Sequence, residues 1–301
     1  MNKSDTSKIH RRKFLGLTGL AIGTLGSGMA LPGWKPSQKA KGKIALQLWT
    51  VRNLLEKDYA GTIEKVANMG YHAVESIAPP DGMSLKDAGN IIIESGLKVC
   101  SAHVDLPKDG KHDWLEMAEA FNCKNMIWHG WPEDQRYKTE DGINELIDIY
   151  HQALDLARSN GLKFGLHNHW WEFEKQPSGK LPFEILLAKL DKDIFFEIDT
   201  YWVKVAGQNP ADIVKKFGDR VKLLHIKDGP ARYTESLDAD EPEPMVAAGQ
   251  GTQNFPEIVK AAEGNVEWMI VELDNCATDM MTAVQESYDY LTGNGLAAGR
   301  V

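Results

Sequence analysis

The chain has 301 residues, 43% of them hydrophobic and 26% charged, which is enough apolar material for one large buried core. Its formal net charge is −9, and because the first thirty residues hold five cations against one aspartate, the remainder carries −13. Such an acidic body repels phosphate backbones, so we expect no nucleic-acid partner. The three cysteines have neither zinc-motif nor disulfide-scaffold spacing and are expected to be buried thiols.

The N-terminus has the form of an export signal. Residues 10–16 (HRRKFLG) resemble a twin-arginine signal, and residues 17–29 form a short, Gly-rich apolar region that is too short for a permanent membrane anchor. We therefore expect residues 1–30 to be a signal peptide read by the twin-arginine export machinery and residues 31–42 to be a linker. The mature protein would then work in the periplasm. A basic disordered tail beside a chance apolar run is the alternative.

Short apolar runs alternate with helical patterns from residue 43 onward. The expected strands are residues 44–48, 73–77, 97–103, 125–129, 163–169, 194–199, 221–226 and 268–273. The expected helices are residues 59–69, 85–94, 113–121, 142–159, 183–190, 211–217, 256–263 and 280–291. Eight such units predict an α/β fold, a single-domain (β/α)8 TIM barrel over residues 43–292, with a C-terminal tail at 293–301. The long acidic connection at 229–254 is expected to be a lid or a solvated loop.

The last four expected strands end on residues that can bind metal. An apolar run leads into His167 and His169, and the next three strands end at Asp199, His225 and Glu272. Active sites of TIM barrels lie at the C-terminal ends of the strands, so these side chains should converge. We expect His167, Asp199, His225 and Glu272 to bind one divalent metal ion. Carboxylate and imidazole donors suit Mn, Zn, Co or Fe without selecting sharply among them. Satisfied polar residues at a barrel mouth are the alternative.

Several sequence runs together resemble the xylose isomerase-like barrel superfamily of sugar phosphate isomerases and epimerases. They are QLWTVR at 47–52, HNHWWEF at 167–173, IDTYW at 198–202, LHIKD at 224–228 and VE at 271–272. The resemblance implies a divalent cation held by one ligand from each of the last four strands, commonly Glu, Asp, His and Glu. This chain departs from that pattern at the first position, where His167 stands in place of glutamate.

Other polar and aromatic residues near strand ends are expected to serve catalysis or substrate binding. Glu272 and Glu75 are expected to act as bases, and Lys227 to donate to a carbonyl or an oxyanion. A structural salt bridge is the alternative for Glu75, and pairing with Asp228 is the alternative for Lys227. The expected substrate-binding residues are Gln47, Trp49, His103, His129, His169, Trp170 and Trp202. Packing in the core is the alternative for the histidines and tryptophans.

The resemblance implies an enzyme that acts on a small-molecule carbohydrate. Removing a proton next to a carbonyl leaves an enediolate, whose charge a divalent cation stabilises. Family epimerases use two metal-bound glutamates, so the imidazole of His167 argues against two-base epimerisation. We place a sugar isomerase/epimerase-type enzyme using one base first, and a lyase or dehydratase acting by β-elimination on a keto-sugar or 3-keto-glycoside second. A non-catalytic sugar-binding barrel and an endonuclease IV-like phosphodiesterase are less favoured. With no glycine-rich phosphate cradle, a non-phosphorylated substrate is expected.

Replacing both Arg11 and Arg12 by lysine should leave the protein in the cytoplasm, because the export machinery reads the arginine pair. Cell fractionation followed by immunoblotting measures the distribution, with the unmodified chain as control. Recovery of the double variant from the periplasm in unchanged amount would refute the export signal.

Overall fold

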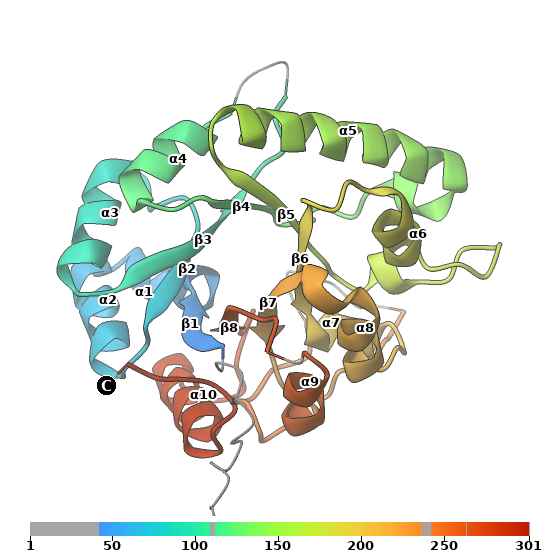
Figure 1. The fold of residues 1–301 in the computed structure, drawn as a ribbon. Coiled ribbons are helices and arrows are strands. Elements are labelled where there is room, and N and C mark those ends of the chain that lie inside the picture. The colour runs from blue at the N-terminus through green and yellow to red at the C-terminus, as the bar shows by residue number, and fades with distance from the viewer. Residues whose placement is uncertain (1–41, 109–111, 236, 238–241, 263, 301) are drawn as a thin grey trace, which may run out of the picture. The chain divides into compact units, whose positions relative to one another are not determined.

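Eight parallel strands close into a barrel in the computed structural model, and helices surround the barrel (Figure 1). The structure describes residues 42–108, 112–235, 237, 242–262 and 264–300. The predicted signal peptide and all but the last residue of the predicted linker lie outside these residues. The strands are β1 (Lys43–Gln47), β2 (Ala73–Ser76), β3 (Lys98–Val104), β4 (Asn125–Trp128), β5 (Lys163–His167), β6 (Phe195–Asp199), β7 (Val221–Ile226) and β8 (Trp268–Val271). Each strand pairs with the next, and β8 pairs with β1, so the predicted (β/α)8 barrel is confirmed.

The helices follow the strands as predicted, with two short additions. The α-helices are α1 (Arg52–Leu55), α2 (Tyr59–Asn68), α3 (Leu85–Glu94), α4 (Trp114–Phe121), α5 (Glu140–Ser159), α6 (Pro182–Lys189), α7 (Thr200–Val205), α8 (Pro210–Phe217), α9 (Phe255–Ala261) and α10 (Met280–Gly293). The 3-10 helices are η1 (Leu48–Val51), η2 (Gln135–Lys138), η3 (Trp171–Phe173) and η4 (Gly218–Arg220). The additions, α1 and α7, are too short to show helical periodicity in the sequence. Among the described residues, no helix is both long and apolar enough to cross a bilayer.

The helix α5 shows how local sequence and packing agree. Thr139 caps its start, where the hydroxyl accepts a hydrogen bond from the N–H of Gly142 at 3.0 Å. Ile143, Leu146 and Tyr150 recur at helical spacing and are buried against the sheet. The periodic pattern therefore gives the helix its position, and the cap places its first turn two residues before the predicted start.

The interior of the barrel is layered. Alternate residues of each strand point inward, and an apolar plug fills the end where the strands begin. The plug consists of Ala45, Ala73, Cys100, Ile127, Phe195, Leu223 and Ile270. Gly165 leaves room for it, because a Cβ at residue 165 would lie 2.5 Å from the Phe195 ring. Two residues further along their strands, the buried inward side chains are polar: Gln47, Glu75, Glu197, His225 and Glu272. A polar layer thus lies directly on the apolar plug.

The segment after α10 ties the two ends of the described chain together. Ala298 pairs with Lys43, and its N–H donates to the Gly42 carbonyl at 2.9 Å. The guanidinium of Arg300 donates to the carbonyls of Ala67 and Gly96. These contacts attach the C-terminal tail to the end of the barrel opposite the strand C-termini. The cysteines are free, with Cys100 and Cys123 buried as expected and Cys276 partly buried.

A single buried carboxylate anchors the long connection between β7 and α9. Asp228 Oδ1 accepts hydrogen bonds from the N–H groups of Gly229 and Gln253, and Oδ2 from those of Gly249 and Gly251, all at 2.9–3.1 Å. The residue is 1% exposed. A side chain at 251 would collide with this carboxylate, since a Cβ there would lie 2.2 Å from Oδ1. The described part of the connection is therefore fixed to the barrel at both of its ends.

Replacing Asp228 by alanine should lower the free energy of unfolding by roughly 2–4 kcal/mol, because buried N–H groups lose a charged acceptor. Urea denaturation measures the change. Asp81→Ala is the matched control, since Asp81 is exposed in the β2–α3 connection and should change stability by less than about 0.5 kcal/mol. Equal stability of the two variants would contradict the anchoring role.

Candidate active site

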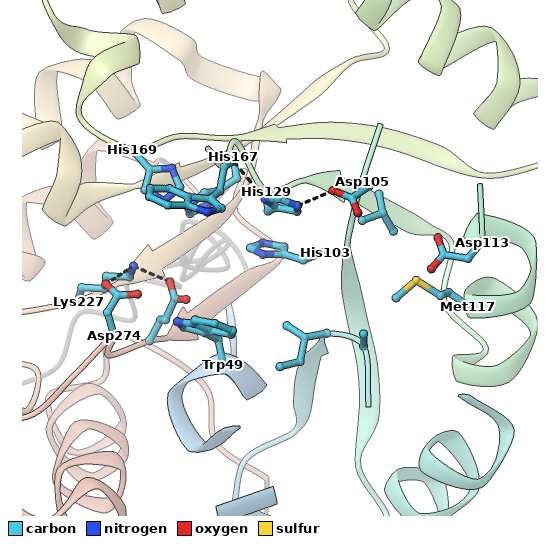
Figure 2. Close-up of a pocket in the computed structure, with 15 residues that line it drawn as sticks. Trp49, His103, Asp105, Asp113, Met117, His129, His167, His169, Lys227 and Asp274 are labelled. Carbon is cyan, nitrogen blue, oxygen red and sulfur yellow. Dashed lines mark hydrogen bonds and ion pairs between the residues drawn. The ribbon is translucent and has the colours of Figure 1, made fainter. Parts of the chain in front are cut away.

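A cavity of about 370 Å³ lies at the C-terminal ends of the strands. Small-molecule sites occupy roughly 300–1,000 Å³, and TIM barrels place their active sites at this end. The described residues that line it are Trp49, Ile77, Ala78, His103, Val104, Asp105, Asp113, Met117, His129, Trp131, His167, His169, Lys227, Glu272 and Asp274. Figure 2 shows Lys227 and Asp274 on one side, His129 and Asp105 across from them, and His103 between the two sides. This cavity is therefore the candidate active site.

The structure brings most of the predicted site residues to this cavity or next to it. The predicted residues that line it are Trp49, His103, His129, His167, His169, Lys227 and Glu272. Those buried in the barrel without lining it are Gln47, Glu75, Asp199 and His225. Trp170 and Trp202 are also absent from the lining and pack on each other, with ring centroids 5.1 Å apart. Packing in the core, the alternative given for these two tryptophans, therefore agrees better with their positions than contact with a sugar ring.

Lys227 lies among three buried carboxylates. Its Nζ is 3.1 Å from Asp199 Oδ2, 2.8 Å from Glu272 Oε2 and 2.9 Å from Asp274 Oδ2. Burial alone would lower the pKa of Lys227, but the charges of Asp199, Asp274 and Glu272 outweigh it and hold that pKa well above its usual value. The side chain is thus a charged ammonium. It pairs with these carboxylates, whereas Asp228 is engaged by the backbone of its own loop.

Glu272 is held as a carboxylate at the edge of the cavity. Burial would raise its pKa, but Lys227 and His225 outweigh burial and hold the pKa well below its usual value. The neighbouring Asp274 differs, because burial raises its pKa to about 6 despite the contact with Lys227. Of the two acids, Glu272 is therefore the one that its surroundings favour in the ionised form.

The imidazole of His225 joins two groups of polar side chains. Its Nδ1 lies 2.7 Å from Glu272 Oε2 and 3.8 Å from Asp199 Oδ2. Its Nε2 lies 2.7 Å from Glu75 Oε1 and 3.2 Å from Glu197 Oε2. Burial would lower the pKa of His225, but Glu197, Glu272 and Glu75 together hold it well above its usual value. Each of the two ring nitrogens therefore lies close to negatively charged carboxylates.

A deeper cluster forms around Glu197, a residue that the sequence prediction missed. Its Oε2 lies 2.8 Å from His103 Nε2 and 3.2 Å from His167 Nδ1. Burial lowers the pKa of both His103 and His167, so both rings favour the neutral form. Glu75 adds a second carboxylate, with Oε1 accepting from Gln47 Nε2 at 2.7 Å. Neutral imidazoles and carboxylates are the donors that divalent transition metals bind.

Two groups of these donors can hold a metal ion. The first is Asp199, His225 and Glu272, and the second is His103, His167, Glu197 and His225. The atoms Asp199 Oδ2, Glu272 Oε2, His167 Nδ1, Glu197 Oε1 and His225 Nδ1 are buried and make no aligned hydrogen bond within the described residues, although some have ionic neighbours. Buried oxygens and nitrogens without a hydrogen-bond partner are rare in native proteins unless an ion or a water molecule satisfies them. The site therefore fits a divalent cation. The four predicted metal ligands do not all fall in one group: Asp199, His225 and Glu272 form the first, whereas His167 belongs to the second.

The tautomer of His129 is set by the backbone. The N–H of Trp131 donates to His129 Nδ1 at 3.1 Å, so Nε2 carries the hydrogen and donates to Asp105 Oδ1 at 3.2 Å. Burial and the nearby His103 lower the pKa of His129 to about 4. At neutral pH this ring is therefore an uncharged hydrogen-bond donor that faces the cavity.

The fold and the site together define a TIM barrel with a buried acid–imidazole centre at the mouth. The chain belongs to the xylose isomerase-like TIM barrel family, whose model matches residues 63–292. An inosose dehydratase from Clostridium beijerinckii is 26% identical over 153 residues, which are 47% of this chain and 50% of the relative. The chain thus spans about half the length of the curated relatives it matches.

Solved structures of other proteins share this fold. A sugar phosphate isomerase/epimerase from Parabacteroides distasonis has a TM-score of 0.71 at 24% identity, over 87% of this chain and 97% of that one. The IOLI protein with a bound zinc atom has a TM-score of 0.62 at 16% identity, over 84% and 98% of the two chains. At these identities the likeness establishes the barrel, and the chemistry has to be argued from the site.

Replacing Lys227 by methionine should lower the free energy of unfolding at pH 7 by about 3–5 kcal/mol, because buried carboxylates lose their cation. The pairing holds the pKa of Glu272 below its usual 4.5, so its stabilisation is present above that pH and is lost as the pH falls. The gap between the variant and the unmodified protein should therefore narrow in acid.

Urea denaturation at several pH values measures this gap. Lys86→Met, at an exposed position of α3, is the control and should leave stability nearly unchanged. A gap that widens towards low pH would contradict the assigned pairing.

Proposed function

We propose that this protein is a metal-dependent lyase that removes a proton next to the carbonyl of a keto-sugar and expels an oxygen substituent from the adjacent carbon. One observation carries the proposal: Glu272 is the one glutamate among the described residues that line the cavity. The other expected base, Glu75, is fully buried and engaged by Gln47. One carboxyl group that takes a proton and then returns it suits elimination. Two-base epimerisation as family epimerases perform it uses a second metal-bound glutamate at the end of the fifth strand, and this chain has His167 there.

The proposed step uses Glu272 twice. Its carboxylate takes the proton from carbon, and the carboxyl group then gives the proton to the oxygen that leaves as water or as an alcohol. One C–H bond and one C–O bond break and a C=C bond forms beside the carbonyl, so the reaction needs no oxidant. The ammonium of Lys227, which pairs with Asp199, Glu272 and Asp274, places a positive charge at the cavity wall, and this charge stabilises the negative charge that develops on the substrate oxygen. A bound divalent cation would supply further positive charge to the carbonyl and a neighbouring hydroxyl.

The charge of the cavity favours a substrate without phosphate. Its lining carboxylates are Asp105, Asp113, Glu272 and Asp274. Lys227 is the one lysine or arginine among the described lining residues, and it is already paired. A phosphate group would therefore meet net negative charge. The partly exposed Trp49 offers a ring face to a sugar, and the exposed carboxylate of Asp105, which accepts from His129 Nε2–H, offers an acceptor to a hydroxyl.

Elimination and isomerisation share the first proton transfer, and we place elimination first. The curated relatives that match this chain are named inosose dehydratases, and dehydration of a ketone-bearing polyol is a β-elimination. Isomerisation, which family frequency alone favours, would require the same carboxyl group to return the proton to a second carbon. We propose further that the reaction takes place in the periplasm, which the pair Arg11 and Arg12 supports.

The metal-loaded protein should cleave or dehydrate 3-keto-glucosides and should not interconvert epimers of free aldoses or ketoses. Incubation in D2O followed by NMR and mass spectrometry detects both products and deuterium uptake. Glu272→Gln should lower kcat by about 10²–10⁴-fold, since it removes the base. Glu267→Gln, at an exposed position before β8, should keep full activity. Efficient exchange between carbon epimers in both directions would overturn the proposal.

A further inference from the structure

The cavity extends beyond the residues that the proposed elimination uses. Figure 2 shows Lys227 and Asp274 at one end of it and Asp113 and Met117 at the other. Glu272, the proposed base, lies 2.8 Å from the Lys227 ammonium and therefore belongs to the first end. We call the end around Glu272 the reacting end and the end around Met117 the distal end. The proposed proton transfers give the distal end no role.

A row of imidazole rings separates the two ends. His225 Nδ1 lies 2.7 Å from Glu272 Oε2, and the ring of His103 is stacked on that of His225 with centroids 5.5 Å apart. The centroid of the His129 ring lies 6.3 Å from that of His103, and its Nε2 donates to Asp105 Oδ1. In Figure 2, Asp105 and Lys227 lie on opposite sides of His103. A sugar carbon within reach of Glu272 therefore leaves the space beside Asp105 for a further group.

The distal end combines an apolar floor with an acidic rim. It comes from the ends of β2 and β3, which pair with each other across the closed barrel from β6 and β7, and from α4. Val104 and Met117 are buried, whereas Asp105 and Asp113 are exposed. The apolar residues that line the cavity here are Ile77, Ala78, Val104 and Met117.

This combination selects among chemical groups. An apolar floor favours the flat, apolar face of a ring, because that surface leaves water when it binds. Carboxylates at the rim accept hydrogen bonds from hydroxyl groups. They also repel anions, and the one lysine or arginine among the described lining residues, Lys227, lies at the other end. A neutral ring that carries hydroxyl groups at its edge therefore fits the distal end, and a water molecule would leave most of it unused.

We propose that the distal end is a subsite for the leaving group and that this group is a ring-shaped alcohol. The inference rests on the proposed function, since it takes the reaction to be an elimination from a keto-glycoside. The bond between the sugar carbon and the glycosidic oxygen breaks, and the proton that Glu272 removes goes to that oxygen, so the group departs as a neutral alcohol. Two sources share this chemistry: a second sugar and an alicyclic aglycone.

The first test varies the leaving group. Methyl and cyclohexyl 3-keto-glucosides release alcohols of similar acidity, a glucosyl 3-keto-glucoside releases a second sugar, and an inosose releases water. The value of kcat/KM should be at least about 10-fold higher for the cyclohexyl or the glucosyl compound than for the methyl compound, because the ring buries apolar surface. The higher of the two identifies the source. The highest value for the methyl compound or for the inosose would overturn the inference.

The second test narrows the distal end. Ala78→Trp adds a large side chain at an exposed position that lines the cavity, and Ala60→Trp makes the same change at an exposed position of α2 that does not line it. The ratio of kcat/KM between the cyclohexyl and methyl compounds should fall at least about 10-fold in Ala78→Trp. It should stay unchanged in Ala60→Trp. An unchanged ratio in Ala78→Trp, folded by circular dichroism, would overturn the inference.

Binding of unreactive glycosides separates this inference from the proposed function. Methyl and cyclohexyl β-D-glucopyranosides lack the ketone and cannot undergo the elimination, so calorimetry on the metal-loaded protein measures their affinity alone. The cyclohexyl compound should bind at least about 10-fold more tightly and should lose that advantage in Ala78→Trp. This pattern without turnover of any keto-glycoside would refute the proposed function and leave the subsite standing. Turnover of keto-glycosides with equal binding of the two probes would refute the subsite alone.

Discussion

The burial of several carboxylates inside one barrel is the constraint on which the rest of the site depends. Glu75, Glu197 and Asp199 are fully buried, and Glu272 is 5% exposed. An unpaired buried charge costs several kcal/mol, so each carboxylate needs a cation, a hydrogen-bond donor or a proton. His225 of β7 and Lys227, which directly follows that strand, supply much of the positive charge, because they lie two residues apart and point to the same interior at different depths. The chemistry of the cavity depends on these two positive groups at different depths.

The two depths have different uses. Near the mouth, the Lys227 ammonium keeps Glu272 ionised at the edge of the cavity, where the proposed function uses this carboxylate. Below it, three imidazoles and Glu197 gather where no lysine or arginine of the described chain makes an ion pair. Burial lowers the pKa of His103 and His167, whereas the surrounding carboxylates hold the pKa of His225 well above its usual value. Carboxylates and imidazole nitrogens therefore alternate through neighbouring layers of the same barrel.

Much of this could be predicted from sequence because strand ends carry a strong signal. The alternation of apolar runs and amphipathic segments gave the eight strands, and His167, Asp199, His225 and Glu272 stood out as polar residues that end apolar runs. Glu197 was missed because it lies inside the run FFEID, where it reads as one polar interruption of a strand. Its spacing from Asp199 places it on the same inward face, and that spacing was the available signal.

Other details required the folded chain. Asp274 follows Glu272 by two residues but lies after β8, and nothing local indicates that it meets Lys227 at 2.9 Å. Gln47 looked like a substrate ligand, yet its amide supports Glu75 because β1 and β2 pair in that register. The division of the predicted ligands between two groups depends on ring orientation, since His225 presents Nδ1 to one group and Nε2 to the other. Sequence periodicity fixes the face of a side chain but not the rotation of its ring.

The most direct test of this account is the position of the metal in a crystal of the zinc-loaded protein, located by anomalous diffraction on both sides of the zinc absorption edge. The account predicts one anomalous peak in the buried polar centre, at about 2.0–2.2 Å from His225 and from at least one of the carboxylates beside it. No peak at this centre after zinc loading would contradict it.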